Sequence, residues 1–334
     1  MTVLTGQDWL TAPATRAVIA ALEAAGGPDS ARFVGGCVRN ALIGREIDDI
    51  DIATTLKPEE TERAIRAAGL KAVPTGIAHG TVTAVAGREP FEITTLRRDV
   101  STDGRNATVA FTSDWAEDAA RRDFRLNALY ADGEGRVFDP TGHGVDDAAA
   151  GRIVFVGDPE TRIREDYLRI LRFFRFFAWY GRGQPDAEGL QACRDLAPGM
   201  SRLSAERVSK ELMKLLAAEE PRASMAAMAQ TGVLQQVLPE AGPLDLFNAI
   251  VPLSADPVVR LMTLFAVDAD AMRGAAERLR LPNAVRDRLV ASALAAPAVS
   301  LGMSDASARA AIYRHRGRAV ADAVRRLCVG PACG

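Results

Sequence analysis

The sequence predicts an α+β fold, in which a small head with a mixed or antiparallel sheet is followed by an all-helical chain. Up to about residue 145, short apolar runs alternate with glycine-rich turn signals, a pattern typical of strands joined by tight turns. After residue 146, alanine-, leucine- and arginine-rich segments with helical spacing take over. The length of 334 residues suits two domains or a few small ones.

Local signals place the elements of the head. A helix over 37–43 is expected to end at Gly44, because glycine readily adopts the left-handed conformation found at helix ends. Pro58 marks the start of a helix over 59–68, since proline is favoured in the first turn. A further helix is expected at 15–25, strands at 31–34, 47–53, 81–86, 91–96, 127–131 and 136–138, and a polar loop at 98–113.

The second half reads as helices only. We divide the chain into a head over residues 1–145, a neck over 146–217 and a body over 218–334. Helices are expected at 160–180, 186–195, 204–217, 222–230, 257–266, 270–279, 284–294 and 305–327.

Composition and charge narrow the class of protein. The chain is 48% hydrophobic and 25% charged, which is ordinary for a soluble protein. It has no apolar run long enough for a membrane helix and no signal peptide, and its four cysteines are scattered, so we expect a cytoplasmic protein. Residues 1–150 hold 16 basic and 23 acidic groups, whereas 151–334 hold 25 and 20. A cationic second half beside an acidic first half fits an RNA-binding body attached to a metal-binding head.

Two aspartates stand two positions apart on the strand predicted at 47–53. Residues i and i+2 of a strand share a face, so Asp49 and Asp51 are expected to point the same way. Neighbouring carboxylates repel each other, and burial raises their pKa values unless a cation neutralises them. Because Mg²⁺ prefers oxygen ligands, this pair predicts a metal site.

A diglycine precedes these aspartates. Gly35 and Gly36 stand between a predicted strand and a helix, where backbone N–H groups can approach a phosphate. Arg39, in the first turn of that helix, would contact the same phosphates. A glycine turn and a surface acidic strand are the alternative for each motif alone. Their order along the chain (strand, turn, helix, strand) favours a nucleotide site.

Two more segments of the head carry candidate residues. Glu92 lies on the strand predicted at 91–96 beside the acidic pair, where a third carboxylate would help hold two metal ions for phosphoryl transfer. The alternative is a solvent-facing glutamate on an edge strand. In RRDFRLNALYAD, Arg122 would take a phosphate, and Asp123 or Asn127 would accept from a ribose 2′-hydroxyl. On its own, such a charged loop is usually only solvated.

The segment REDYLRILRFFRFFAWYG, residues 164–181, reads as a helix with polar residues at three-residue spacing. Asp166 and Arg169 would be neighbours on one face, with Arg172 one turn further on. A carboxylate beside a guanidinium matches the donor and acceptor at the edges of cytosine and adenine but not those of uracil and guanine. The pair would therefore select C and A without a template. An ordinary i,i+3 ion pair is the alternative.

Six segments in order resemble the class II tRNA nucleotidyltransferase and bacterial poly(A) polymerase family, in the polymerase-beta superfamily. They are GGCVRNALIG, DIDIATT, RRDFRLNALY, DPTGHGVDD, REDYLRILRFFRF and LSAERVSKEL, and they span about residues 30–220. The resemblance implies a polymerase-beta-like nucleotidyltransferase head, a neck that recognises the base and a body that binds RNA. Relatives commonly continue into a tail domain that holds the tRNA elbow, so we expect this tail to be missing or truncated here.

The resemblance also implies roles for single residues. Asp49 and Asp51 would hold two Mg²⁺ ions and act in catalysis with Glu92. The residues expected to bind the nucleotide are Gly35, Gly36, Arg39, Arg122, Asp123, Asn127, Asp166, Arg169, Arg172 and Arg175. Two positions depart from the usual pattern of the family, which has Asp at position 40 and Thr at position 125 where this chain has Asn40 and Arg125.

The implied activity is template-independent addition of C, C and A to the tRNA 3′ end, with CTP and ATP as substrates and no obligate protein partner. Three alternatives stay open at this point. They are a bacterial poly(A) polymerase, a partial enzyme that adds only A or only CC, and a catalytically idle tRNA-binding protein.

Overall fold

The computed structural model describes residues 2–77, 80–103 and 106–330. The chain forms two compact units, Met1–Asp166 and Tyr167–Gly334. Residues 146–166, which the sequence analysis assigns to the neck, fall within the first unit. The division at residues 145 and 217 remains a proposal about which segments act together in function.

The first unit is built on a seven-stranded sheet with the order β3-β4-β5-β2-β1-β8-β9. Strand β2 runs parallel to β5, and the other neighbouring pairs are antiparallel, which confirms the predicted mixed sheet. Two strands near the middle of the sheet carry the predicted motifs: β1 directly precedes the diglycine, and β2 begins at Asp51. The strands are β1 (Ala31–Val34), β2 (Asp51–Thr54), β3 (Lys71–Gly76), β4 (Thr81–Ala86), β5 (Glu89–Thr95), β8 (Tyr130–Ala131) and β9 (Val137–Phe138).

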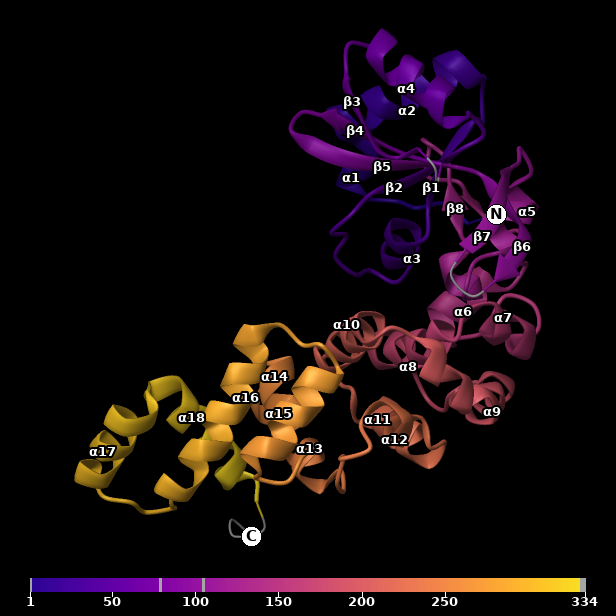
Figure 1. The fold of residues 1–334 in the computed structure, drawn as a ribbon. Coiled ribbons are helices and arrows are strands. Elements are labelled where there is room, and N and C mark those ends of the chain that lie inside the picture. The colour runs from indigo at the N-terminus through magenta and orange to yellow at the C-terminus, as the bar shows by residue number, and fades with distance from the viewer. Residues whose placement is uncertain (1, 78–79, 104–105, 331–334) are drawn as a thin grey trace. The chain divides into compact units, whose positions relative to one another are not determined.

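Helices cover this sheet. Helices α2 and α4 lie side by side and contact its strands (Figure 1). Helix α3 directly follows β1, as the glycine signals predict. The helices of this unit are α1 (Asp8–Thr11), α2 (Pro13–Gly26), α3 (Gly36–Leu42), α4 (Pro58–Ala67), α5 (Trp115–Ala120), α6 (Gly144–Ala150) and α7 (Pro159–Glu165), with a 3₁₀ turn η2 (Arg125–Asn127).

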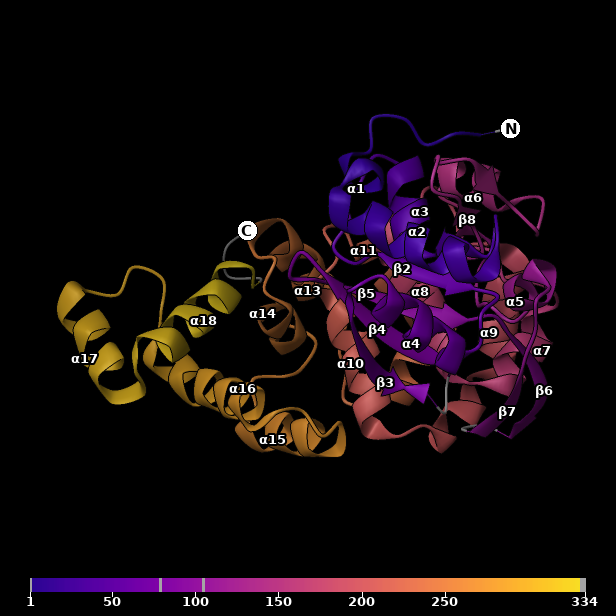
Figure 2. The ribbon, with the colours of Figure 1, turned by 90° about the horizontal axis from the view of Figure 1, so that it is seen from above.

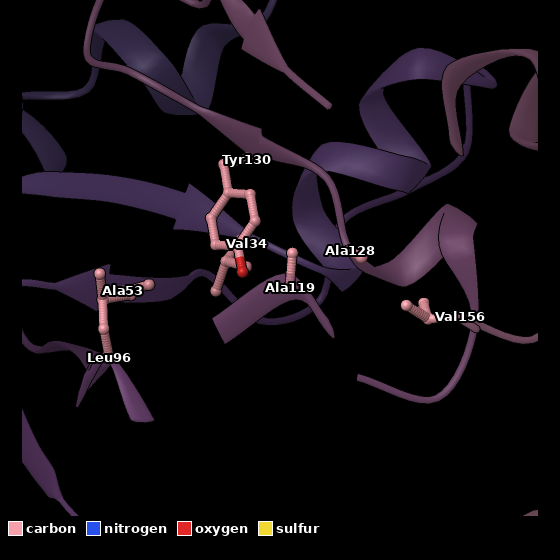
Figure 3. Close-up of a cluster of buried hydrophobic side chains, with 7 residues drawn as sticks. All are labelled: Val34, Ala53, Leu96, Ala119, Ala128, Tyr130 and Val156. Atoms are coloured by element: carbon pink, nitrogen blue, oxygen red, sulfur yellow. The ribbon is translucent and has the colours of Figure 1, made fainter. Parts of the chain in front are cut away.

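A buried cluster joins the central strands to the elements behind them (Figure 3). It contains one residue each from β1, β2, α5 and β8, so strands and helix are fixed against one another. Close packing of this kind leaves little room for neighbouring elements to shift. Its members are Val34, Ala53, Leu96, Ala119, Ala128, Tyr130 and Val156.

Three predictions about the head are wrong. The strand expected at 127–131 is reduced to β8 (Tyr130–Ala131), because the chain first forms the 3₁₀ turn η2. The strand expected at 47–53 begins only at Asp51, and residues 45–50 form neither helix nor strand. The segment 98–113, expected to be a loop, contains the hairpin β6 (Arg97–Asp103) and β7 (Asn106–Phe111); residues 104–105 lie outside the described residues. The sequence of these two strands lacks the alternation of apolar and polar residues by which a half-buried strand is recognised. The strands pair with each other and not with the main sheet.

The second unit is helical, as predicted (Figure 2). Helix α16 contacts both α15 and α18. Its helices are α8 (Leu168–Tyr180), α9 (Ala187–Leu196), α10 (Ala205–Leu216), α11 (Arg222–Gln230), α12 (Val233–Val237), α13 (Asp245–Ile250), α14 (Pro257–Met262), α15 (Ala269–Arg278), α16 (Asn283–Ala295), α17 (Asp305–His315) and α18 (Gly317–Cys328). The 3₁₀ turns are η3 (Ala197–Arg202), η4 (Val251–Leu253) and η5 (Ala296–Ala298).

Two of the predicted helices are divided. The helix expected over 160–180 breaks at Asp166, whose φ of −153° and ψ of 106° are extended values. Aspartate is a poor residue for a helix interior because its short carboxylate competes for nearby backbone N–H groups. The helix expected over 305–327 breaks at Arg316, whose φ of 70° lies in the left-handed region.

Some arginines of the basic second half serve the fold. Arg260 is 2% exposed, and its guanidinium donates to the backbone carbonyls of Leu216, Val251 and Ser254 at 2.7, 3.1 and 2.7 Å. Arg326, also buried, donates to the carbonyls of Met262 and Phe265. Buried carbonyls need such donors, so these side chains replace missing backbone partners at helix ends. Among the described residues, no helix is long and apolar enough to span a bilayer.

Candidate active site

The diglycine occupies the turn between β1 and α3, as predicted. Gly35 has a φ of 71°, which a residue with a side chain rarely adopts. Its N–H donates to the Leu129 carbonyl at 3.1 Å. A Cβ atom at Gly35 would lie 3.7 Å from Nη1 of Arg122, so the turn brings the backbone close to a predicted phosphate ligand. From the sequence, Gly35 and Arg122 were expected in one site only because of the resemblance to the nucleotidyltransferase family.

Asp51 and Glu92 face each other across two parallel strands. In the register of β2 and β5, Asp51 is the partner of Glu92, and the next pair, Ile52 and Ile93, is buried. Side chains of register partners share a face, so both carboxylates lie on the side opposite these isoleucines. Strand β5 lies between β4 and β2, so Glu92 does not stand on an edge strand. It is nevertheless exposed.

Negative charge is crowded around Asp51. Burial, followed by the neighbouring carboxylates of Glu92 and Asp49, raises the pKa of Asp51 to about 6, while the charge of Arg122 acts in the opposite direction. Each of these causes requires proximity, so the three carboxylates and Arg122 lie in one region of the head.

Asp49 was predicted to share a strand with Asp51, and this is wrong. Asp49 is exposed and lies in the coil before β2, so alternation along a strand does not orient its side chain. Its effect on the pKa of Asp51 shows that it still lies near that residue. Asp49 is therefore carried on the loop formed by residues 45–50, which starts where α3 has ended.

The donors present suit a hard divalent cation. Asp49, Asp51 and Glu92 offer only oxygen atoms, which Mg²⁺ prefers. Burial, and then the charges of Glu92 and Asp49, raise the pKa of Asp51, and a cation would offset both effects. Within residues 2–77, 80–103 and 106–330, no three His, Cys, Asp or Glu side chains already form a metal-binding group. The oxygen donors of these three residues nevertheless fit a hard divalent cation.

Arg39 is held inside the site by neutral partners. The side chain is 6% exposed. Its Nη1 donates to Oδ1 of Asn127 at 2.5 Å, and Nδ2 of Asn127 donates to Oδ1 of Asp123 at 3.1 Å. Its Nε and Nη2 donate to Oδ1 of Asn40 at 3.1 and 2.8 Å. Both Asp123 and Asn127 are buried, so these three predicted residues form one rigid hydrogen-bonded group.

Arg122 is fixed by a residue that the sequence analysis missed. Oδ2 of Asp118 accepts from Nη2 of Arg122 at 3.0 Å and from the Tyr130 hydroxyl at 2.7 Å. Oδ1 accepts from Nε of Arg121 at 3.0 Å and from the backbone N–H of Arg97 at 3.1 Å. Burial alone would raise the pKa of Asp118, but Arg122, Arg121 and the Tyr130 hydroxyl lower it to about 2.

The spacing of Asp118 was the signal that could have identified it. Asp118 precedes Arg121 and Arg122 by three and four residues, the spacing at which helical side chains meet. Helix α5 had not been predicted, so the pairing was not considered.

The neck residues have their own support in the second unit. Arg175 donates from Nε to Oε2 of Glu211 at 2.5 Å, and Nη1 of Arg172 lies 4.0 Å from Oε1 of the same carboxylate. Glu211 is buried, and α8 and α10 contact each other along this pair. Arg169 is half-buried in the first turn of α8. Glu211, another residue that sequence reasoning did not single out, therefore orients two of the three predicted arginines.

The structure unites part of the predicted site. Contacts, register or electrostatic effects connect the residues predicted in the head in one continuous group: Gly35, Gly36, Arg39, Asp49, Asp51, Glu92, Arg122, Asp123 and Asn127. Asp166 ends the first unit, and Arg169, Arg172 and Arg175 belong to the second. The i,i+3 helical pairing expected for Asp166 and Arg169 is wrong, because α8 begins only at Leu168.

Asp118 gives a prediction of pH-dependent stability. The folded-state pKa of about 2 lies below the value of about 3.9 for an unfolded aspartate, so its contribution is complete above about pH 4 and is lost as pH falls toward 2. Asp118→Asn should lower the free energy of unfolding at pH 7 by about 2 kcal/mol. Denaturant titrations at pH 7 and near pH 2.5 measure this difference, which should shrink at the lower pH.

The matched control for that substitution is Asp8→Asn, which changes an exposed aspartate of the same unit and should leave stability nearly unchanged. Equal stability of Asp118→Asn and wild type at pH 7 would contradict the role given to Asp118.

Comparisons with known proteins agree with the motifs. The profile of the family described as "Poly A polymerase head domain" matches residues 31–154. A second profile, "Probable RNA and SrmB- binding site of polymerase A", matches residues 184–243. The first match contains every candidate residue of the head, and the second lies wholly in the helical unit.

Individual relatives carry related names. The chain is 39% identical over 250 residues to the mitochondrial CCA tRNA nucleotidyltransferase 1 of Danio rerio, covering 72% of this chain and 57% of that protein. It is 39% identical over 220 residues to the CCA-adding enzyme of Streptococcus gordonii, covering 65% of this chain and 53% of that enzyme. The chain thus spans little more than half the length of the curated relatives that it matches.

Solved structures extend the likeness to the whole fold. The structure of the Bacillus stearothermophilus CCA-adding enzyme in complex with CTP is similar with a TM-score of 0.77 and 26% identity, over 96% of this chain and 80% of that one. The Thermotoga maritima CCA-adding enzyme complexed with tRNA shares the fold with a TM-score of 0.69 and 19% identity, over 98% of this chain and 86% of that one. The chain belongs to the tRNA nucleotidyltransferase and poly(A) polymerase family.

Proposed function

We propose that this protein adds C, C and A to the 3′ end of tRNA without a template, using CTP and ATP and releasing pyrophosphate. The observation that carries the proposal is the group of carboxylates around Asp51, placed beside the diglycine turn and Arg122. The names of the similar enzymes, and the CTP and tRNA in the solved structures of two of them, support this choice of substrates. The expected cytoplasmic location remains part of the proposal.

The residues of the head divide the work of phosphoryl transfer. The tRNA 3′-hydroxyl attacks the α-phosphorus, a new phosphodiester bond forms, and the bond to the bridging oxygen of pyrophosphate breaks. Asp49 and Asp51 would hold the metal, with Glu92 as a third carboxylate. Mg²⁺, when bound by these carboxylates, would supply positive charge that stabilises the negative charge developing during phosphoryl transfer. Gly35, Gly36, Arg39 and Arg122 would bind the triphosphate, and Asp123 with Asn127 the sugar.

The neck would choose the base. Arg169 and the carboxylate of Asp166 would meet the hydrogen-bonding edge shared by cytosine and adenine. Arg172 and Arg175 would line the same pocket, and Glu211 holds both in place. Uracil and guanine present a carbonyl oxygen and an N–H in the opposite order, so both contacts would fail. Selection of the base does not require Asp166 and Arg169 to lie one turn apart on a single helix. It requires only that both side chains reach the hydrogen-bonding edge of the base.

The function itself is tested with purified protein, Mg²⁺, CTP and ATP, offered a tRNA transcript lacking its CCA end or an unrelated RNA. We expect three nucleotides on the tRNA and none on the other RNA, read on a sequencing gel. A long A tract on both RNAs would identify a poly(A) polymerase, the alternative that the name of the head family favours. One or two added nucleotides would indicate a partial enzyme. No incorporation would leave an RNA-binding protein and refute the proposal.

The metal assignment predicts a loss of chemistry without a loss of fold. Asp51→Asn should lower the rate of CTP incorporation by roughly a thousandfold or more, because it removes a charged metal ligand. Single-turnover rates measure this, and circular dichroism checks the fold. Asp48→Asn is the matched control, since Asp48 is an exposed aspartate in the coil directly before β2 and should retain activity. Similar losses in both variants would argue against a specific ligand.

The base-reading role predicts relaxed selection. Arg169→Ala should raise misincorporation of UTP and GTP relative to CTP by roughly tenfold or more, because the mismatch at the base edge is no longer penalised. Competition assays with all four nucleotides give this ratio. Arg164→Ala is the control, since Arg164 is an exposed arginine paired with Glu160 at 2.9 Å. Unchanged rejection of UTP and GTP by Arg169→Ala would remove Arg169 from this role.

A further inference from the structure

The side chain of Asn40 uses both ends of its amide. Its Oδ1 accepts from Nε and Nη2 of Arg39 at 3.1 and 2.8 Å, and its Nδ2 donates to the carbonyl of Glu46 at 2.7 Å. A guanidinium can only donate and a carbonyl can only accept, so the chemistry of the neighbours fixes the orientation of the amide. One side chain thus connects Arg39 with the coil that follows α3.

At one end, Asn40 helps to aim a predicted phosphate ligand. Arg39 is buried between two amides, Asn40 on Nε and Nη2 and Asn127 on Nη1. A Cβ atom at Gly36 would lie 3.9 Å from Nη2 of Arg39, so this edge of the guanidinium borders the diglycine turn. Neither amide carries a charge, and these bonds therefore orient the guanidinium without adding an anion beside it.

At the other end, Asn40 holds the coil that carries Asp49. Glu46 precedes Asp49 by three residues, and residues 45–50 have no regular secondary structure. The backbone repeats the link, because the N–H of Arg45 donates to the carbonyl of Asn40 at 2.9 Å. The side chain and the backbone of one residue thus fix the start of the segment that leads to the predicted metal ligand.

We propose that Asn40 is a positioning residue that couples the two halves of the site, the guanidinium that binds the triphosphate and the loop that presents Asp49. This inference rests on the proposed function for its substrate. In this chain the role uses both ends of the amide. A carboxylate of the same shape, which the family usually has at this position, keeps the acceptor for Arg39 but loses the donor to Glu46. Alanine keeps neither bond.

The test compares Asn40→Ala and Asn40→Asp with wild type. Asn40→Ala should raise KM for CTP by roughly tenfold, as expected for a misdirected charged hydrogen-bond donor, whereas Asn40→Asp, which keeps the acceptor for Arg39, should raise it less. KM for the tRNA transcript should stay within about twofold of wild type, because the site for RNA is not touched. Hydrogen exchange of the backbone amides of residues 44–50 should be faster in both variants, since both lose the bond to Glu46.

Asn248→Asp is the matched control, because Asn248 is exposed on α13 in the other unit and should change neither readout. General damage to the fold would lower kcat while leaving KM for CTP unchanged, and that result would overturn the proposal. Wild-type exchange at residues 44–50 in both variants would also overturn it. If wild type incorporates no nucleotide, the proposed function fails on its own. Exchange and equilibrium binding of CTP with Mg²⁺ then still decide the role of Asn40.

Discussion

The parallel pairing of β2 with β5 is the constraint on which the candidate site depends. Pairing in this register places Asp51 opposite Glu92 on one face and buries Ile52 and Ile93 on the other. A shift by one residue would turn the carboxylates toward the core and the isoleucines toward solvent. The buried isoleucines therefore stabilise an arrangement of like charges that electrostatics alone disfavours. Burial, and then the charges of Glu92 and Asp49, raise the pKa of Asp51, which shows this cost.

The two arginines of the head that we propose to bind phosphate are held in different ways. Arg122 is paired with the carboxylate of Asp118, whereas Asn40 and Asn127 hold Arg39 through neutral amides. A carboxylate partner fixes the side chain firmly, but it also offsets part of the charge that a phosphate would feel. Amide partners orient the guanidinium and leave the field of its charge on the phosphate side. In this arrangement Arg122 gives rigidity to the turn, and Arg39 gives more of its charge to the ligand.

Local signals predicted most of the head, and they failed where tertiary contacts decide. The bounds of β1 and the turn at Gly35 follow from apolar patterning and glycine chemistry, which act within a few residues. The coil at residues 45–50 could not be predicted, because the alternation of apolar and polar residues in a sequence does not show whether a neighbouring strand is present to pair with it. The hairpin of β6 and β7 was missed for the converse reason, since its sequence shows no regular alternation of apolar and polar residues. Glu211 could be recognised only once the fold had placed it beside its arginines, whereas the spacing of Asp118 from Arg121 and Arg122 would have indicated its role had α5 been predicted.

Net charge by itself overstates the surface available to RNA. Residues 151–334 hold more basic than acidic groups, but Arg260 and Arg326 are buried and bound to backbone carbonyls. Arg288 is likewise committed, with Asp256 at 2.7 Å and Asp322 at 2.7 Å. A long side chain with a planar fork of donors suits the capping of several carbonyls at once, which is a structural use of arginine. The positive charge that can meet a phosphate backbone is therefore that of the exposed arginines and lysines. The buried arginines must therefore be left out when RNA binding is inferred from the charge of the sequence.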